Sequence, residues 1–334
     1  MLENTELQGR RPTWAQKADL LTASITTADG KLQAEQRKKF ILVPIAKSVL
    51  LPRIQSVTIT NEDNKFPVMG SLGDQVWHPG VEMQELPQSQ RVAPTFPNAV
   101  ELKTNEWIAQ IFYPGYFLKA NVEGAQFQST LLAYLGLHSK RDIENYVLNG
   151  DTSSTNDLLG LQDGLRAGMV TNTYAAGGVS MSTAGETILR NMMLQLPEEI
   201  YDDVQPVNDG TGPNSPGWAF YMTRPVREAW RTRLQARGTA LGDANITGRA
   251  LDYDGIPLIR VPLMPGTLGV GGNESQILYS NLKGFLWGVH EDVLLETEYH
   301  KMTRSFGMVM SMRVGQSWGY EPASGVKTTG VLNS

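Results

Sequence analysis

The sequence predicts an α+β fold built from more than one part, and three observations support this. Apolar residues at three- and four-residue spacing cover residues 122–148 and predict one long helix. Between residues 165 and 288, short apolar runs bounded by Gly and Pro alternate with shorter helical patterns, as expected for a mixed domain. The chain has 334 residues, which suggests about two domains of roughly 150 residues each.

The composition excludes several classes of protein. A hydrophobic fraction of 41% is enough for a sizeable core, so the chain is not disordered as a whole. The net charge of −5 argues against tight electrostatic binding to duplex DNA, which needs a clustered basic face. Because Cys is absent, the chain has no disulfide scaffold, no thiol nucleophile and no zinc site built on Cys.

No segment reads as a membrane span or a secretory signal. The longest apolar stretch, residues 40–46, contains Pro44 and is far shorter than the about 20 residues of a span. The N-terminus has no apolar stretch of the kind that signal peptides carry. We therefore expect synthesis in the cytoplasm and no membrane partner.

Residues 1–45 are predicted to form a polar arm. Thr13 is placed to cap a short helix through Leu21, and residues 31–39 suggest a second, charged helix. Neither has a continuous apolar face, so the arm would need a partner to become ordered; an ordinary frayed terminus is the alternative.

Residues 46–114 are predicted to form a long two-stranded excursion. Residues 56–60 alternate as a strand, a second extended stretch follows at 100–112, and Pro and Gly residues are frequent between them. So long a loop is uncommon inside a compact domain and is usually functional or bound to a partner. It cannot bury much apolar surface alone, so we expect it to lie against another body.

The long helix is predicted to begin after Asn121, a capping residue, and to end at Asn149-Gly150-Asp151. If unbroken it is about 40 Å long, at 1.5 Å per residue. Gly136 is a place where it could bend or split.

The mixed region offers four more elements. Thr183 and Glu186 have the spacing of a capping box, which predicts that a helix begins at this point. Trp218–Met222 reads as a buried strand, followed by a helix capped by Thr223, and residues 256–261 read as another buried strand.

Residues 289–320 are predicted to be rich in strands. Met308, Met310 and Met312 alternate with other residues as in a strand, which is most simply core packing. The tail from Glu321 is small and polar and is predicted to be loose.

Motifs for catalysis, cofactors or metals are missing. The sequence has no phosphate loop of the Walker type and no Gly-x-Ser-x-Gly elbow, and its four His residues do not form the helical pair of a zinc protease. A solvated turn is the better interpretation of His290-Glu291-Asp292, and a polar loop that of the Asp-rich residues 202–209. The glycines at 266–272 read as a loop. The basic helix residues predict a solvated face or an interface; they are Arg227, Arg231, Arg233 and Arg237. We therefore expect no enzyme activity, no cofactor and no metal.

The order of these regions resembles the major capsid proteins of tailed bacteriophages, whose fold is named after phage Hong Kong 97. The resemblance covers nearly the whole chain and is carried by RDIENYVLNGDTSSTNDLLGLQDGL (141–165), YMTRPVREAWRTRLQARG (221–238), DGIPLIRVPLMP (254–265) and residues 288–319. It implies an N-terminal arm (1–45), an extended E-loop region (46–114), a peripheral or P-domain (115–174) with a spine helix (122–148), an axial or A-domain (175–288), a return to the P-domain (289–320) and a C-terminal tail (321–334).

The resemblance implies a shell protein that self-assembles into hexamers and pentamers of an icosahedral head. It would enclose double-stranded DNA without sequence-specific binding, in a virion assembled in the host cytoplasm. The sequence starts almost directly in the presumed arm, without a scaffolding extension. We therefore expect a separate scaffolding protein, or assembly without one, with a portal and decoration proteins as further partners.

The resemblance also suggests candidate residues at contacts between subunits: Lys65, Phe66, Trp77, His78, Arg91, Arg231 and Arg237. Some relatives join an E-loop Lys to an Asn of a neighbouring subunit with the help of a Glu. Lys65, Asn281 and Glu291 are the candidates for such a cross-link in this chain.

Three other interpretations remain open. An encapsulin, a bacterial compartment with an enzyme cargo, shares the fold. A β-rich hydrolase would use paired carboxylates such as Glu291 and Asp292. A tail or decoration protein would form rings or trimers rather than closed shells.

Overall fold

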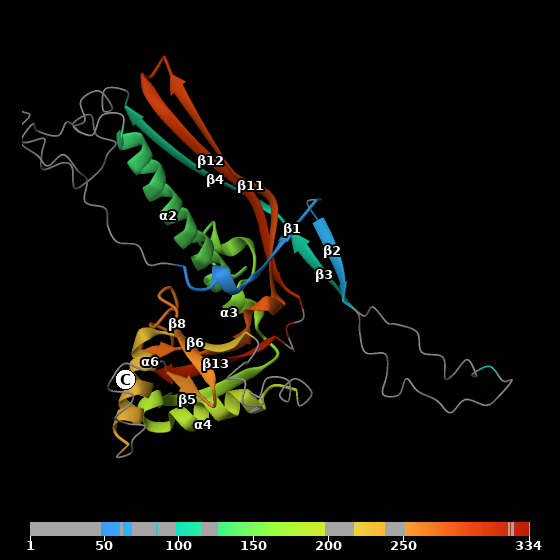
Figure 1. The fold of residues 1–334 in the computed structure, drawn as a ribbon, viewed down its shortest axis with the longest axis vertical. Coiled ribbons are helices and arrows are strands. Elements are labelled where there is room, and N and C mark those ends of the chain that lie inside the picture. Colours follow the sequence, from blue (N-terminus) through green and yellow to red (C-terminus); the bar gives the residue numbers. More distant parts are fainter. Residues whose placement is uncertain are drawn as a thin grey trace, which may run out of the picture. The chain divides into compact units, whose positions relative to one another are not determined.

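The computed structural model describes residues 48–60, 63–68, 85, 98–114, 126–197, 217–237, 251–319, 321 and 324–333 (Figure 1). The chain divides into two compact units. Among described residues, the first unit contains Glu106–Asp142 and Glu291–Arg313, and the second contains the remainder. The arm and its two expected helices lie outside the described residues.

A four-stranded sheet has the strand order β1-β11-β12-β4. The strands are β1 (Gln55–Thr58), β11 (Phe285–His300), β12 (Ser305–Trp318) and β4 (Asn105–Pro114). In Figure 1, β11, β12 and β4 run side by side as long ribbons. β1 follows the short 3-10 helix η2 (Leu51–Arg53) and pairs in parallel with residues 286–289 of β11. Gly288 allows this close packing, because a Cβ there would lie 2.2 Å from Ile59 Cδ1.

The excursion has a different ladder from the one predicted. β2 (Asp63–Val68) pairs antiparallel with β3 (Asn98–Lys103), from Asp63 opposite Lys103 to Val68 opposite Asn98. The predicted strand at 56–60 corresponds to β1, which pairs with β11 instead. The single extended stretch predicted at 100–112 is two strands, β3 and β4, interrupted at Thr104.

The predicted long helix is confirmed over α2 (Gln126–Asn149), whereas its predicted cap, Asn121, lies outside the described residues. Gly136 does not split it, and a Cβ at that position would meet nothing within 4 Å. Near its end, the buried Glu144 accepts hydrogen bonds from the backbone N–H groups of Val49 (2.7 Å) and Leu50 (2.9 Å). This carboxylate therefore anchors the segment that leads into β1.

The second unit contains a seven-stranded sheet of order β5-β13-β10-β6-β8-β7, with β9 paired to β13. Its strands are β5 (Thr173–Ser180), β6 (Trp218–Met222), β7 (Asp252–Tyr253), β8 (Ile256–Arg260), β9 (Glu274–Ser275), β10 (Leu278–Asn281) and β13 (Gly325–Leu332). All five residues of β6 are buried, which confirms the prediction of a buried strand. β8 is only partly buried: Ile256 and Leu258 are inside, whereas Arg260 is exposed.

Two helices complete the core of this unit. α4 (Met181–Leu194) packs against β5 and β13, α6 (Arg224–Gln235) packs against β8, and the helices contact each other. The other sheet face meets the segment around α3 (Leu165–Gly168), where a Cβ at Gly325 would lie 2.7 Å from Met169 Cε. Burial on both faces explains the continuous apolar run of β6.

Two sequence predictions are wrong in this unit. The residue before α4 is Ser180, not Thr183, and Glu186 pairs with Arg233 of α6 and with Arg237 beyond its end rather than closing a capping box. The tail from Glu321 is not loose as a whole, because β13 pairs with β5, β9 and β10 and buries Val326 and Val331 completely.

Candidate interaction surface

The first unit exposes several large apolar side chains, most of them on its sheet. Eight of them lie in the first unit, seven on β4, β11 and the turn after β11, and one on α2; they are Ile108, Phe112, Leu137, Val293, Leu294, Leu295, Tyr299 and Met302. Large exposed apolar surfaces on a soluble protein usually mark a contact site.

β11 is uncovered on both faces in this unit. Successive strand residues point to opposite faces, so Val293 and Leu295 lie on one face and Leu294 on the other. Their exposed fractions are 53%, 41% and 55%. The apolar stripe therefore cannot be the inner face of a core formed by this chain's described residues.

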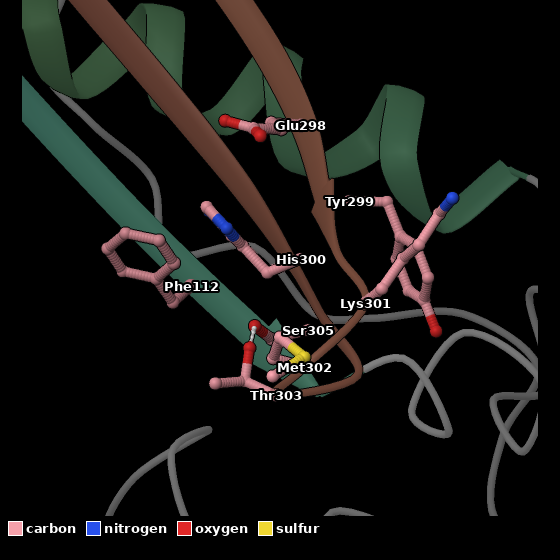
Figure 2. A pocket seen from close by; sticks show the side chains of 8 residues that line it. All are labelled: Phe112, Glu298, Tyr299, His300, Lys301, Met302, Thr303 and Ser305. Atoms are coloured by element: carbon pink, nitrogen blue, oxygen red, sulfur yellow. Dashed lines mark hydrogen bonds between the residues drawn. The ribbon is translucent and has the colours of Figure 1, made fainter.

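A pocket of about 720 Å³ lies at the turn that joins β11 to β12. In Figure 2, His300 points toward Phe112 of β4, whereas Tyr299 and Lys301 point to the opposite side. The rings of His300 and Phe112 lie 5.9 Å apart. Met302, at the tip of the turn, is 99% exposed, so the pocket has an apolar rim.

Charged groups hold the three strands together on one face. Arg313 of β12 lies 3.5 Å from a carboxylate oxygen of Glu106 on β4 and 3.6 Å from one of Glu291 on β11. The side chains are partly exposed, so these pairs position the strands more than they stabilise them.

The excursion carries the contact candidates Lys65 and Phe66. Lys65 Nζ lies 2.6 Å from Glu101 Oε1 across the β2–β3 ladder, and Phe66 is half-buried opposite Val100. The hydrogen bond and the charge of Lys65, with the charge of Lys103, lower the pKa of Glu101. Trp77, His78 and Arg91 lie outside the described residues.

Arg231 and Arg237 were also predicted at contacts between subunits. Arg231 lies within α6, whereas Arg237 lies just beyond its end, and the two have different partners. Arg231 Nη1 lies 3.0 Å from Glu228 Oε2 on the same helix. Arg237 binds Glu186 of α4, which Arg233 also approaches at 3.5 Å. The arginines that the sequence placed in one basic group therefore have different partners: Arg231 pairs with Glu228, and Arg233 and Arg237 pair with Glu186.

The cross-link candidates have roles of their own in the structure. Asn281 ends β10, and its Oδ1 accepts a hydrogen bond from Lys283 N (3.2 Å) at the start of the 3-10 helix η5 (Leu282–Gly284). Glu291 pairs with Arg313, and Lys65 with Glu101.

Neither a metal centre nor a membrane span stands out in the part of the chain that the structure describes. No group of three or more His, Asp or Glu residues there could hold a metal ion. His290 instead lies 3.1 Å from the carbonyl oxygen of Ile59 through its Nδ1. No described helix is long and apolar enough to cross a membrane.

Sequence reasoning missed the exposed stripe of β11. The signal was present in Glu-Asp-Val-Leu-Leu-Glu-Thr-Glu (291–298), where three consecutive apolar residues stand between carboxylates. Such a run fits a strand with two apolar faces, but the pattern alone does not say whether anything covers them.

Comparison with known proteins points to capsid subunits. No family model matches the chain. It is 23% identical over 311 residues to the "Putative prophage capsid protein YqbE" of Bacillus subtilis (strain 168), covering 91% of this chain and 94% of that protein.

Solved structures show the same fold at low identity. The capsid of an empty GTA particle has a TM-score of 0.60 and 14% identity, over 92% of this chain and 99% of that chain. The SrpI encapsulin of Synechococcus elongatus PCC 7942 has a TM-score of 0.53 and 11% identity, over 95% of both chains. The chain therefore has the fold shared by phage-type capsid subunits and an encapsulin, as the sequence resemblance predicted.

Proposed function

We propose that this chain is the major capsid protein of a tailed bacteriophage, which assembles in many copies into the shell that encloses double-stranded DNA. One observation carries the proposal beyond the fold: β11 exposes large apolar side chains on both faces. Burying a Val or Leu side chain stabilises a contact by about 1.5–3 kcal/mol. Neighbouring copies in a shell could cover such faces, whereas a monomer leaves them in water.

Weak contacts are sufficient for such a role. In a closed, symmetric assembly each copy makes the same contacts many times, so individually modest surfaces give a shell that is hard to dissociate. The β2–β3 ladder fits an E-loop, α2 fits the spine helix of a P-domain, and the seven-stranded sheet fits an A-domain. We place the assembled protein in a virion, built in the host cytoplasm with a separate scaffolding protein, a portal and decoration proteins.

The geometry gives a hydrolase little support. Glu291 and Asp292 are neighbours on β11, so their side chains point to opposite faces and do not form a pair. Both are exposed, and Glu291 is paired with Arg313. A glycosidase-type mechanism needs two carboxyl groups that flank one bond.

An encapsulin is the second candidate, because the SrpI subunit matches 95% of the chain. The contents of particles isolated from the host distinguish the two. Nuclease-resistant double-stranded DNA supports the phage shell, and a protein cargo without DNA supports the encapsulin.

The exposed stripe gives a direct test of assembly. The double variant V293E/L295E places two charges on one face of β11, where both side chains are exposed in the single chain. We expect unchanged circular dichroism and thermal unfolding, but loss of high-mass particles in light scattering. The matched control is V270E, which adds a charge at a fully exposed Val in the second unit. If V293E/L295E forms particles as the wild type does, the stripe is not a shell contact.

A further inference from the structure

The exposed side of α6 carries a cluster of positive charge. Arg224, Arg227 and Arg231 follow one another at three- and four-residue spacing, which places them on one side of the helix. Arg260 ends β8, the strand that packs against α6 and whose Leu258 carbonyl accepts a hydrogen bond from Arg227. We call these four residues the arginine patch. Arg233 and Arg237 do not belong to it, because they face Glu186 of α4.

The patch is short of negative charge. Glu228 is the one described carboxylate paired with it, at 3.0 Å from Arg231 Nη1 and 3.8 Å from Arg227 Nη1. Arg224 and Arg260 are exposed and form no ion pair with described residues. Burial, together with the nearby Arg231 and Arg260, lowers the pKa of Arg227, as expected where cations crowd.

The two central arginines are already held in place. The side chains of Arg227 and Arg231 are only 22% and 28% exposed, and Arg227 Nε donates a hydrogen bond to the carbonyl of Leu258 at 3.3 Å. A guanidinium fixed in this way loses little freedom when it binds a carboxylate, and its planar fork matches two carboxylate oxygens.

The chain itself contains a complementary segment. Residues 198–203, Glu-Glu-Ile-Tyr-Asp-Asp, hold four carboxylates in six positions and no basic residue, and no other six-residue window has as many. The segment lies outside the described residues. Its charge is the opposite of that of the arginine patch.

We propose that the arginine patch of one copy binds the acidic segment 198–203 of a second copy. The inference rests on the proposed shell function. Each copy then supplies one patch and one segment, which is a head-to-tail contact that closes rings of identical subunits. Each contact combines several charge-assisted hydrogen bonds. It opposes the repulsion between two copies that each carry a net charge of −5.

A nucleic acid is a less suitable occupant. Single strands bind to basic grooves that also offer aromatic rings for stacking, and Trp230, the aromatic residue of α6, is only 2% exposed. Duplex DNA requires a broad basic face. The patch has four positive charges with Glu228 among them, on an acidic protein.

Charge reversal in separate chains tests whether the contact joins two copies. The patch-reversed chain is R224E/R260E, and the segment-reversed chain is E199K/D202K. We expect each alone to assemble about tenfold less efficiently or worse, as judged by light-scattering mass and pelleted fraction. A 1:1 mixture should recover rings of six, in which the two chains alternate and each meets an opposite charge on its neighbours; a ring of five cannot alternate in this way. The control R190E/K283E reverses two exposed cations outside the patch and should assemble normally.

Each other outcome overturns the proposal. If the chain carrying all four reversals assembles but the mixture forms no rings of six, the contact lies within one chain. If neither assembles, patch and segment do not meet. If the patch-reversed chain assembles normally but loses affinity for a single-stranded oligonucleotide, the patch is a nucleic-acid site.

A second measurement does not depend on assembly. A labelled peptide of residues 196–205 should bind the unassembled wild-type chain, and its affinity should fall as the salt concentration rises. Its affinity for R224E/R260E should be about tenfold lower. No binding at millimolar peptide would overturn the proposal. A wild-type chain that binds the peptide but never assembles would instead contradict the shell function.

Discussion

Trp230 is the largest of the fully buried side chains among the described residues, and it joins α6 to α4. It is 2% exposed, its ring lies 5.9 Å from that of Tyr253, and a Cβ at Gly185 would lie 2.6 Å from its Cε3 atom. The glycine therefore leaves the space that the indole ring occupies, and the two residues fix the distance between the helices.

Replacing Trp230 by Ala should lower the free energy of unfolding by about 3–5 kcal/mol, since a large core cavity is created. Urea unfolding followed by circular dichroism measures this. Leu194→Ala on α4 is the matched control, because Leu194 is 58% exposed and its loss should cost less than about 0.5 kcal/mol. Equal stability of the two variants would place Trp230 outside the core.

The pair Lys65–Glu101 predicts a pH dependence of the excursion. Because Lys65 lowers the pKa of Glu101 below its ordinary value of 4.5, the pair stabilises the ladder at neutral pH, and this contribution is lost as the pH falls through the lowered pKa. In Lys65→Met, the pKa of Glu101 should rise toward 4.5, as followed by NMR titration of its carboxyl carbon. An unchanged pKa would show that the pair does not form in solution.

At the level of elements, β13 shows why the sequence predicted some strands and not others. β6 was predictable because its five residues are apolar and buried. β13 contains the buried Thr328, whose Oγ1 accepts a hydrogen bond from Ile277 N at 3.2 Å, a partner 51 positions away. Because the hydrogen-bond partner of Thr328 is so distant in the sequence, local patterns do not reveal it, and the segment was predicted to be a loose tail. The same holds for Glu186, whose partners Arg233 and Arg237 lie in α6 and just beyond its end.

Deletion of residues 324–334 should abolish the cooperative unfolding of the second unit, because it exposes the edges of β5 and β10 and removes Val326 and Val331 from the core. Limited proteolysis and the urea m-value report this. Thr329→Ala, at an exposed position of the same strand, should change the stability by less than about 0.5 kcal/mol. A folded deletion variant would contradict the central place of β13.

The excursion is expected to serve assembly rather than folding. Replacing residues 69–97 by a short Gly-Ser turn keeps β2 and β3 paired, because Val68 lies opposite Asn98 at the end of the ladder. We expect the same thermal unfolding as the wild type and no shells in electron micrographs. Normal shells from this variant would refute the E-loop assignment.

For the whole molecule, the sequence predicted the order of parts better than the contact surfaces. The long helix, the buried strand β6 and the helix after Thr223 follow from local patterns. The exposed stripe on β11 and the division of the arginines over two faces of α6 depend on which elements pack together, which no local pattern reports. Burial, rather than residue type, therefore identified the candidate surface.

Electron microscopy of the purified protein, together with light-scattering mass, shows whether copies of this chain form a closed shell. We expect closed particles, or rings of five and six subunits, in the wild type and in V270E but not in V293E/L295E. A monomer of 36.8 kDa at every protein and salt concentration would contradict it.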